Sequence, residues 1–345
     1  MRHRNARRSG FVLHEIVLVS LLPVALIAIL MPAVLQVREA ARRTVCLNNL
    51  KQIGLGMANY EITFRCFPPG TIHGLADASG RTFSDKELDA PSFQGNWGWG
   101  VFLLPFLEEE SLYNRLSPFG DQTISKWIEQ NDNSVSRPIR MYRCPTDFGS
   151  GDNRERLFAN PSETQFTALA HSNYVGSNGS GELRRNSPAA NGVFFVNSNM
   201  KHGHVGDGSS NTIQIGERGR MLPARGWFDN SLEPHAAVAF GTRGVREASQ
   251  HGLADNMGSG RYRLNSRMTS NGPGGPVVHA RRAFSSAHRG VVQFLMVDGS
   301  ARSLSERIDA DIDPQTDTTT TVEVDSVFER LMSINDGQHV GEADF

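Results

Sequence analysis

MRHRNARRSG (residues 1–10) followed by FVLHEIVLVSLLPVALIAILMPAVL (residues 11–35) is the stretch that decides the organisation of this chain. The first ten residues carry four arginines, and the next 25 are apolar with a single acid, Glu15. A membrane-spanning helix needs about 20 apolar residues, and clustered arginines keep their end of such a helix in the cytoplasm. We therefore expect a single membrane crossing at about residues 11–35, with the amino terminus cytoplasmic and the bulk of the chain exported.

Glu15 is the residue that a plain membrane anchor does not explain. A carboxylate inside a spanning segment costs about 2.5–3.5 kcal/mol on insertion scales, so it is a functional-site hypothesis by default. Cleavage between Gly10 and Phe11 would create a free amine at Phe11, one helical turn before Glu15. This geometry suits pairing between subunits of a membrane-rooted filament.

These residues resemble the amino terminus of the type IV prepilin and pseudopilin class. Gly10 matches the cleavage position of that class, Phe11 its first mature residue and Glu15 its fifth, and Pro32 falls where the class often has a proline. The resemblance implies that a prepilin peptidase removes residues 1–10 and methylates the new amine. It further implies that the chain resides in the inner (cytoplasmic) membrane, with its bulk periplasmic or extracellular, and assembles with other pilin-like subunits into a type II secretion or type IV pilus-like filament.

Two other interpretations of this segment stay open. A secretory signal peptide has an apolar core of about 7–15 residues, which is shorter than the run found here, and a small-x-small cleavage site. A plain single-span anchor gives the same topology but assigns no role to Glu15.

The helix is expected to continue to residue 60, because an apolar stripe recurs at i, i+4, i+7, i+11 and i+14. The stripe consists of Cys46, Leu50, Ile53, Met57 and Tyr60. The opposite face is polar from Arg38 onward, so the stripe should be the spine against which the exported domain packs. Pro23 and Pro32 are expected to kink or locally melt the helix.

The expected fold class is α+β, with the pilin-like helix at 11–60 packed on a β-rich, loop-rich domain at 61–345. The clearest element of this domain is a hairpin at 291–304, because Asp298-Gly299 between two strand-like runs is the strongest short-range hairpin signal. The other expected elements are a helix at 101–116, strands at 172–175, 192–196 and 212–215, and a short helix at 326–334.

His288 precedes Asp298-Gly299 with nine residues between the histidine and the aspartate. This spacing resembles the H-X9-DG processing-associated signature that closes a large prepilin-like family with an exported domain of unknown function, DUF1559. The same resemblance recurs in the blocks at 46–54, 67–70, 104–108, 144–147 and 207–218. A strand of ten steps at about 3.3 Å places His288 and Asp298 roughly 33 Å apart, so we do not expect them to form one catalytic site.

Three cysteines, Cys46, Cys66 and Cys144, allow one disulfide and leave one thiol over. An exported domain faces an oxidising compartment, where disulfides persist. A Cys46–Cys144 bridge would tie the domain to its helix. The alternative is three reduced, buried thiols.

Little in the sequence points to catalysis, to a metal or to a cofactor. His202 and His204 would share one face of a strand as a metal pair, but no third ligand is near them in sequence. The block at 207–211 offers oxygens to calcium, which some pseudopilins bind, although a simple Asx-type turn explains it equally. We therefore assign no metal site and no cofactor, with calcium as the one open alternative. Trp97 and Trp99 are expected to pack in a core rather than to face a ligand.

Three classes of function remain. The first is a structural, pilin-like subunit, the second a membrane-tethered module that binds a ligand or partner without polymerising, and the third an anchored hydrolase. The hydrolase ranks last because no nucleophile–base pair is evident, so we do not expect an enzyme. Net charge is −1 with both signs interspersed, so nucleic acid is not expected as a partner.

Overall fold

The structure is a computed structural model, and it describes most of the chain in separate ranges. These ranges are 13–72, 95–118, 124–130, 133–147, 149–162, 164–185, 187–223, 232–234, 237–243, 252–266, 282–310, 324–338 and 340–341. Side chains are not described for 13–20, 22–25, 155, 221–223, 232–234 and 243. The predicted processing residues Gly10 and Phe11 and the side chain of Glu15 therefore lie outside what the structure describes.

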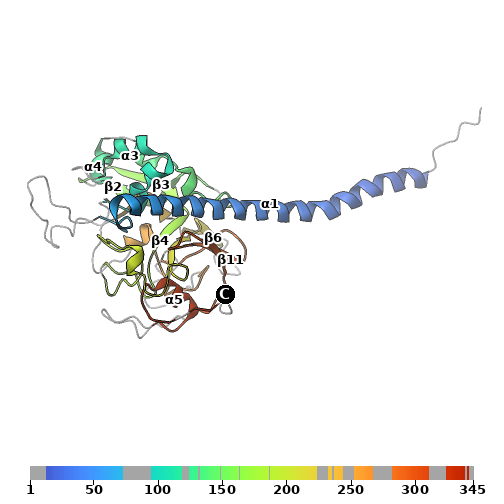
Figure 1. Cartoon of the computed structure of the whole chain (residues 1–345). Coiled ribbons are helices and arrows are strands. Elements are labelled where there is room, and N and C mark those ends of the chain that lie inside the picture. Colours follow the sequence, from blue (N-terminus) through green and yellow to red (C-terminus); the bar gives the residue numbers. More distant parts are fainter. Residues whose placement is uncertain are drawn as a thin grey trace, which may run out of the picture. The chain divides into compact units, whose positions relative to one another are not determined.

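The chain divides into two compact units, Met1–Thr44 and Val45–Phe345. Helix α1, Leu13–Phe64, is 52 residues long and supplies the described part of the first unit (Figure 1). It stays helical at both Pro23 and Pro32, so the local melting expected there does not occur. The helix expected at 11–60 is confirmed for residues 13–60 and continues for one further turn.

Among the residues that the structure describes, no helix combines the length and the apolar character that a membrane crossing requires. The crossing expected at about residues 11–35 begins outside the described residues and stays a prediction.

The second unit is organised around a five-stranded sheet with the strand order β10-β4-β5-β11-β12. Its strands are β10 Met257–Ser259, β4 Tyr174–Gly179, β5 Ile213–Glu217, β11 Val291–Met296 and β12 Ala301–Ser305. β10 runs parallel to β4, and every other neighbouring pair is antiparallel. β11 therefore sits inside the sheet, between β5 and β12, and the sheet is buried over most of its length.

The predicted hairpin at 291–304 is confirmed as β11 and β12. Its turn is wider than a two-residue connection, because the strands stop at Met296 and resume at Ala301. Gly299 has a positive φ of 83°, whereas Asp298 does not, and instead the Asp298 carboxylate accepts a hydrogen bond from the Ser300 backbone N–H at 2.8 Å. Of these two turn residues, Gly299 alone therefore adopts a positive φ.

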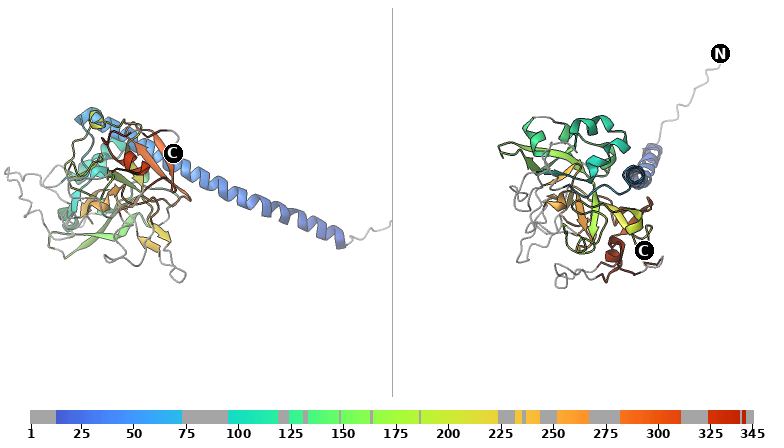
Figure 2. Two further views of the ribbon diagram at one scale, coloured as in Figure 1. Left: turned by 90° about the horizontal axis from the view of Figure 1, so that it is seen from below. Right: turned by 60° about the vertical axis from the view of Figure 1, so that its left-hand side comes forward.

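Three smaller sheets complete the strands of the described residues. β2 Asp152–Ala159, β3 Phe166–Ser172 and β8 Ala237–Val238 form one, in the order β2-β3-β8. β1 Gly95–Trp97 pairs with β9 Gly241–Arg243, and β6 Met221–Pro223 pairs with β7 Leu232–Pro234. The short helices α3 Glu110–Leu116 and α4 Ile124–Glu129 lie on one side of this unit, and α5 Val327–Met332 lies on the opposite side (Figures 1 and 2).

The single helix expected at 101–116 is wrong. The segment forms α2 Trp99–Phe102, the 3₁₀ helix η1 Leu104–Leu107 and α3. Glu108 has a left-handed φ of 63°, which ends η1 and separates it from α3. The remaining 3₁₀ helices are η2 Asn133–Ser136, η3 Arg140–Tyr142, η4 His202–His204 and η5 Leu253–Asp255.

The strand predictions hold in part. The run at 212–215 falls largely in β5, and the run at 172–175 covers the end of β3 and the start of β4 with Asn173 between them. The run at 192–196 is not a strand, although it makes two backbone hydrogen bonds to β4 and one isolated bridge between Val196 and Thr71. The short helix expected at 326–334 is confirmed as α5, which starts with a capping box formed by Ser326 and Glu329.

The predicted stripe on the second half of α1 is confirmed as core. Cys46, Leu50 and Ile53 are 0% exposed, and Met57 and Tyr60 are 1% and 4% exposed. Each large apolar side chain buried in this way contributes about 1.5–3 kcal/mol. Trp97 and Trp99 are also buried in this core, as expected. The helix is therefore an integral core element of the second unit from Cys46 onward.

Candidate functional site at the Cys46–Cys144 bridge

Cys46 and Cys144 form a disulfide, with 5.3 Å between their Cα atoms and a sequence separation of 98. The predicted pairing is confirmed, and Cys66 is the free cysteine. In the chain-entropy account, a bridge that closes a loop of about 100 residues stabilises a fold by up to about 4.7 kcal/mol. The bridge therefore fastens α1 covalently to the rest of the second unit.

Hydrogen bonds surround the bridge on the helix side. The Asn49 side chain donates to the Arg143 carbonyl at 2.8 Å, and the Tyr174 hydroxyl donates to the Cys46 carbonyl at 3.3 Å. Burial, and then the nearby charge of Glu217, raise the pKa of Tyr174 well above its ordinary value. The tyrosine therefore stays protonated and keeps its role as a donor.

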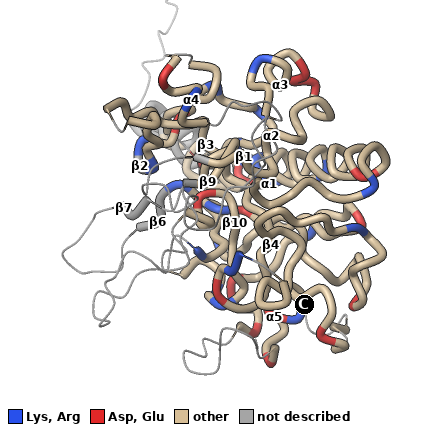
Figure 3. The backbone as a smooth tube through the Cα atoms, turned by 90° about the vertical axis from the view of Figure 1, so that its left-hand side faces the viewer, with Lys and Arg blue, Asp and Glu red and all other residues tan. Residues whose placement is uncertain are grey.

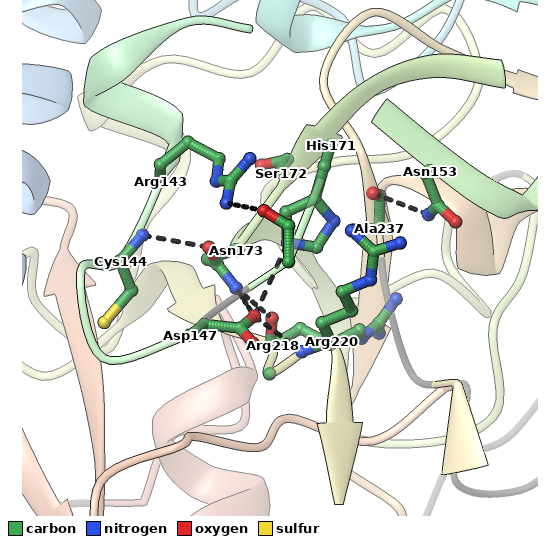
Figure 4. A network of polar contacts seen from close by, with 12 residues as sticks. Arg143, Cys144, Asp147, Asn153, His171, Ser172, Asn173, Arg218, Arg220 and Ala237 are labelled. Carbon is green, nitrogen blue, oxygen red and sulfur yellow. Dashed lines mark hydrogen bonds and ion pairs between the residues drawn. The ribbon is translucent and has the colours of Figure 1, made fainter. Parts of the chain in front are cut away.

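The turn that carries Cys144 is held by a second polar network (Figure 4). The Cys144 backbone N–H donates to Asn173 Oδ1 at 2.9 Å. The side-chain amide of Asn173 and the backbone N–H of Arg220, the latter at 2.7 Å, both donate to Asp147 Oδ2. His171 Nε2 lies 3.5 Å from the same oxygen, and burial lowers the pKa of His171. The Cys-Pro-Thr-Asp block therefore serves to position Cys144.

His288 reaches the bridge from the other side. Its Nε2 lies 3.4 Å from Cys144 Sγ and 3.9 Å from Glu217 Oε1, and the residue is 1% exposed. Asp298 lies beyond the opposite end of β11, so the expectation that His288 and Asp298 do not form one site is confirmed. The structure instead brings His288 to the cysteine pair, which the sequence analysis did not anticipate.

Glu217 and Arg218 form a buried, charged hub at the end of β5. Glu217 Oε2 accepts hydrogen bonds from the Ser286 hydroxyl at 2.8 Å and from the Gln293 backbone N–H at 3.1 Å. The Arg218 guanidinium is fully buried and donates only to backbone carbonyls among the contacts described, at 2.6–3.0 Å. The accepting residues are Ala254, Met257, Arg282 and Ala283. The signal available in the sequence was an acid followed directly by an arginine at the end of a short strand-like run, Ile213–Glu217.

The turn of the β11–β12 hairpin packs against the same helix. A Cβ added to Gly54 would lie 2.9 Å from Leu295 Cδ1 and 3.5 Å from Gly299 Cα. Cys46 and Gly54 are eight residues apart on α1, which corresponds to about 12 Å along the axis. The segment from His288 to Gly299 therefore meets the α1 region at both of its ends.

The other candidate residues have structural contacts. Asp207 accepts backbone hydrogen bonds through both carboxylate oxygens, from Asp336 at 2.7 Å and Gly337 at 2.9 Å. His202 and His204 lie in η4 rather than on a strand, so the expected strand-face pair is wrong. His202 pairs with Glu61, and its ring lies 5.1 Å from that of Phe67.

Among the described residues, one cluster brings together four side chains that carry potential metal-ligand atoms. Cys46, Cys144, Glu217 and His288 are all buried, and their Sγ, carboxylate and imidazole atoms lie within 4.8 Å of one another. All four come from different segments that are remote from one another in sequence, so the fold alone assembles this group.

Residues 36–311 match the family described as Protein of unknown function (DUF1559). The match covers more than half of the chain, and the chain belongs to this family. No curated protein and no solved structure matches the chain. All four residues of the cluster lie within the matched range, whereas Gly10, Phe11 and Glu15 precede it.

Proposed function

We propose that this chain is a pilin- or pseudopilin-like structural subunit. In this proposal a prepilin peptidase cleaves after Gly10 and methylates Phe11, and residues 11–35 anchor the chain in the inner membrane. The helix then packs against the helices of other copies in a type II secretion or type IV pilus-like filament, and the domain from residue 61 is exported.

The observation that carries this proposal is the exposure of apolar side chains on the first half of α1. The eight large apolar residues described between 26 and 37 are 47–72% exposed. These residues are Leu26, Ile27, Ile29, Leu30, Met31, Val34, Leu35 and Val37. Soluble monomers rarely leave so much contiguous apolar surface in water, so lipid or neighbouring helices are needed to cover it. A helix that is apolar on several faces can be covered by lipid before assembly and by neighbouring helices in the filament.

Glu15 supplies the specificity of the proposed packing. A plain anchor would gain nothing from an acid whose insertion costs about 2.5–3.5 kcal/mol. In a filament, the amine at Phe11 of one copy neutralises Glu15 of its neighbour in a low-dielectric setting, where an ion pair is strong. The pair therefore offsets the insertion cost and selects one axial offset between subunits.

The disulfide between α1 and the rest of the second unit suits a subunit that has to withstand force along its helix. Force applied along the helix reaches the exported domain through the Cys46–Cys144 bond and the packed stripe from Leu50 to Tyr60. Acidic and basic residues are interspersed over the domain in the view of Figure 3, which favours a solvated outer surface over a nucleic-acid interface.

Mass spectrometry and one variant test the proposal together. The mature protein should begin with an N-methylated Phe11, and an intact Met1 terminus or a cut beyond residue 30 would contradict the proposal. Glu15→Ala should abolish recovery of the chain in sheared fibres while leaving membrane insertion intact. Glu15→Asp, which keeps the charge, is the matched control. Unchanged behaviour of Glu15→Ala would favour the alternative, a tethered module that binds a ligand or partner and does not polymerise.

A further inference from the structure

The structure holds two cysteines, a histidine and a glutamate in one buried cluster, and the proposed function uses only the bridge between the two cysteines. We propose that, when Cys46 and Cys144 are reduced, the chain binds one zinc ion through Cys46 Sγ, Cys144 Sγ, His288 Nε2 and Glu217 Oε1. This site is independent of whether the chain forms a filament.

One distance already present matches an edge of a tetrahedral zinc site, and a second is slightly longer than such an edge. Zinc bonds of about 2.3 Å to sulfur and about 2.0–2.2 Å to nitrogen or oxygen place neighbouring ligand atoms roughly 3.3–3.8 Å apart. His288 Nε2 lies 3.4 Å from Cys144 Sγ and 3.9 Å from Glu217 Oε1. All four ligand atoms lie within 4.8 Å of one another, so opening the disulfide to thiolate spacing is the main adjustment required.

Hydrogen bonds from neighbouring residues orient the proposed ligands, as hydrogen bonds to metal ligands do in known metal sites. Glu217 Oε2 is held by Ser286 and Gln293, which directs Oε1 toward His288. Cys144 is fixed through its backbone N–H by Asn173 Oδ1 at 2.9 Å. Two of the ligands, Glu217 in β5 and Cys46 in α1, sit on regular elements, so the geometry does not depend on loops alone.

The identity of the metal follows from the donor atoms. Two thiolates exclude calcium and magnesium, which prefer oxygen ligands, whereas one imidazole and one carboxylate complete a common zinc set. The four residues are 0–4% exposed, so no side is open for a substrate or a catalytic water. The site is therefore a closed, structural one.

The bridge and the zinc site are alternative states of the same two sulfurs. A small disulfide such as oxidised glutathione can take the two electrons of the thiolates. Cys46 and Cys144 then form the bridge, the glutathione disulfide is cleaved to two thiols that take up two protons, and Zn²⁺ leaves because both sulfur ligands are lost. The junction between α1 and the domain is held in either state, by the ion or by the covalent bond.

Metal analysis of the purified full-length chain tests the proposal. The chain is reduced with a phosphine, stripped with a chelator and equilibrated with Zn²⁺, and elemental analysis should give about one zinc per chain. Co²⁺ in place of Zn²⁺ should give an intense thiolate-to-metal charge-transfer band and tetrahedral ligand-field bands. Oxidised glutathione should release the zinc, as followed with a colorimetric zinc chelator.

Variants identify the ligands. The double variant Cys46→Ser/Cys144→Ser should bind no zinc, and His288→Gln and Glu217→Gln should each weaken binding at least about tenfold. Cys66→Ser and His202→Gln are the matched controls, because they change the same residue types outside the cluster, and they should bind as the unmodified chain does. Circular dichroism distinguishes a lost ligand from a lost fold.

Three results would overturn the proposal. One is a reduced, unmodified chain that binds zinc no better than the double cysteine variant, whether it stays folded or not. Another is bound Co²⁺ without a thiolate charge-transfer band. The third is zinc affinity that neither His288→Gln nor Glu217→Gln alters in variants that remain folded.

Discussion

The two halves of α1 are made from similar apolar residues but meet different surroundings. Leu30 and Leu35 are 58% and 60% exposed, whereas Leu50 and Ile53 are 0% exposed. Secondary structure is the same in both halves, so the difference arises from what each half packs against. The apolar face of the second half packs within its own domain, whereas the apolar side chains of the first half are exposed.

The largest expected difference between the two halves of α1 is in the loss of stability when one leucine in each half is replaced by alanine. Leu50→Ala removes a fully buried side chain and should lower the free energy of unfolding of the domain by about 3–5 kcal/mol. Leu30→Ala should change the same quantity by less than about 0.5 kcal/mol, because its side chain contributes no core contact. Chemical denaturation followed by tryptophan fluorescence checks both values. Equal losses for the two variants would show that both halves belong to one core.

Removal of the bridge should have the next largest effect. Cys46→Ala/Cys144→Ala should destabilise the domain by about 2–4 kcal/mol under oxidising conditions, because the open chain regains loop entropy when it unfolds. Cys66→Ala should have little effect on the same measurement, since that cysteine is free. Denaturation with and without a reductant provides the check. A reductant-sensitive stability in the double variant would place the bridge elsewhere.

The pH dependence of the junction should be the smallest effect. Burial lowers the pKa of His171, opposed by the neighbouring Asp147 carboxylate and reinforced by Arg143 and Arg220. The unfolded chain therefore binds a proton below about pH 6.5 that the folded chain does not, so stability falls as the pH drops below that value. The slope can reach about 1.4 kcal/mol per pH unit.

His171→Gln should flatten this part of the pH profile, measured as the urea midpoint between pH 7 and pH 5. A profile that keeps its slope in His171→Gln would assign the dependence to another group.

Patterns within a short stretch of sequence predicted those helices and hairpins whose residues interact mainly with near neighbours along the chain. The stripe from Cys46 to Tyr60, the hairpin around Gly299 and the capped helix after Ser326 all follow from spacing within a few turns. The helix expected at 101–116 failed because a left-handed residue, Glu108, interrupts an otherwise helical pattern. No strong signal marks that residue, because glycine and asparagine are the usual occupants of this conformation.

The sequence by itself determined the long helix, the face of its second half that becomes buried and the hairpin at 291–304, whereas the structure decided which two of the three cysteines pair. The features that the sequence determined depend on periodicity or turn chemistry, which are properties of neighbouring residues. Only the tertiary structure decided that His288 meets Cys144 and Glu217, and that Arg218 gathers four carbonyls from two distant segments. The physical reason is that a buried polar group forms hydrogen bonds with the partners that the fold places within about 3 Å of it. The spacing of residues along the chain does not predict which partners these are.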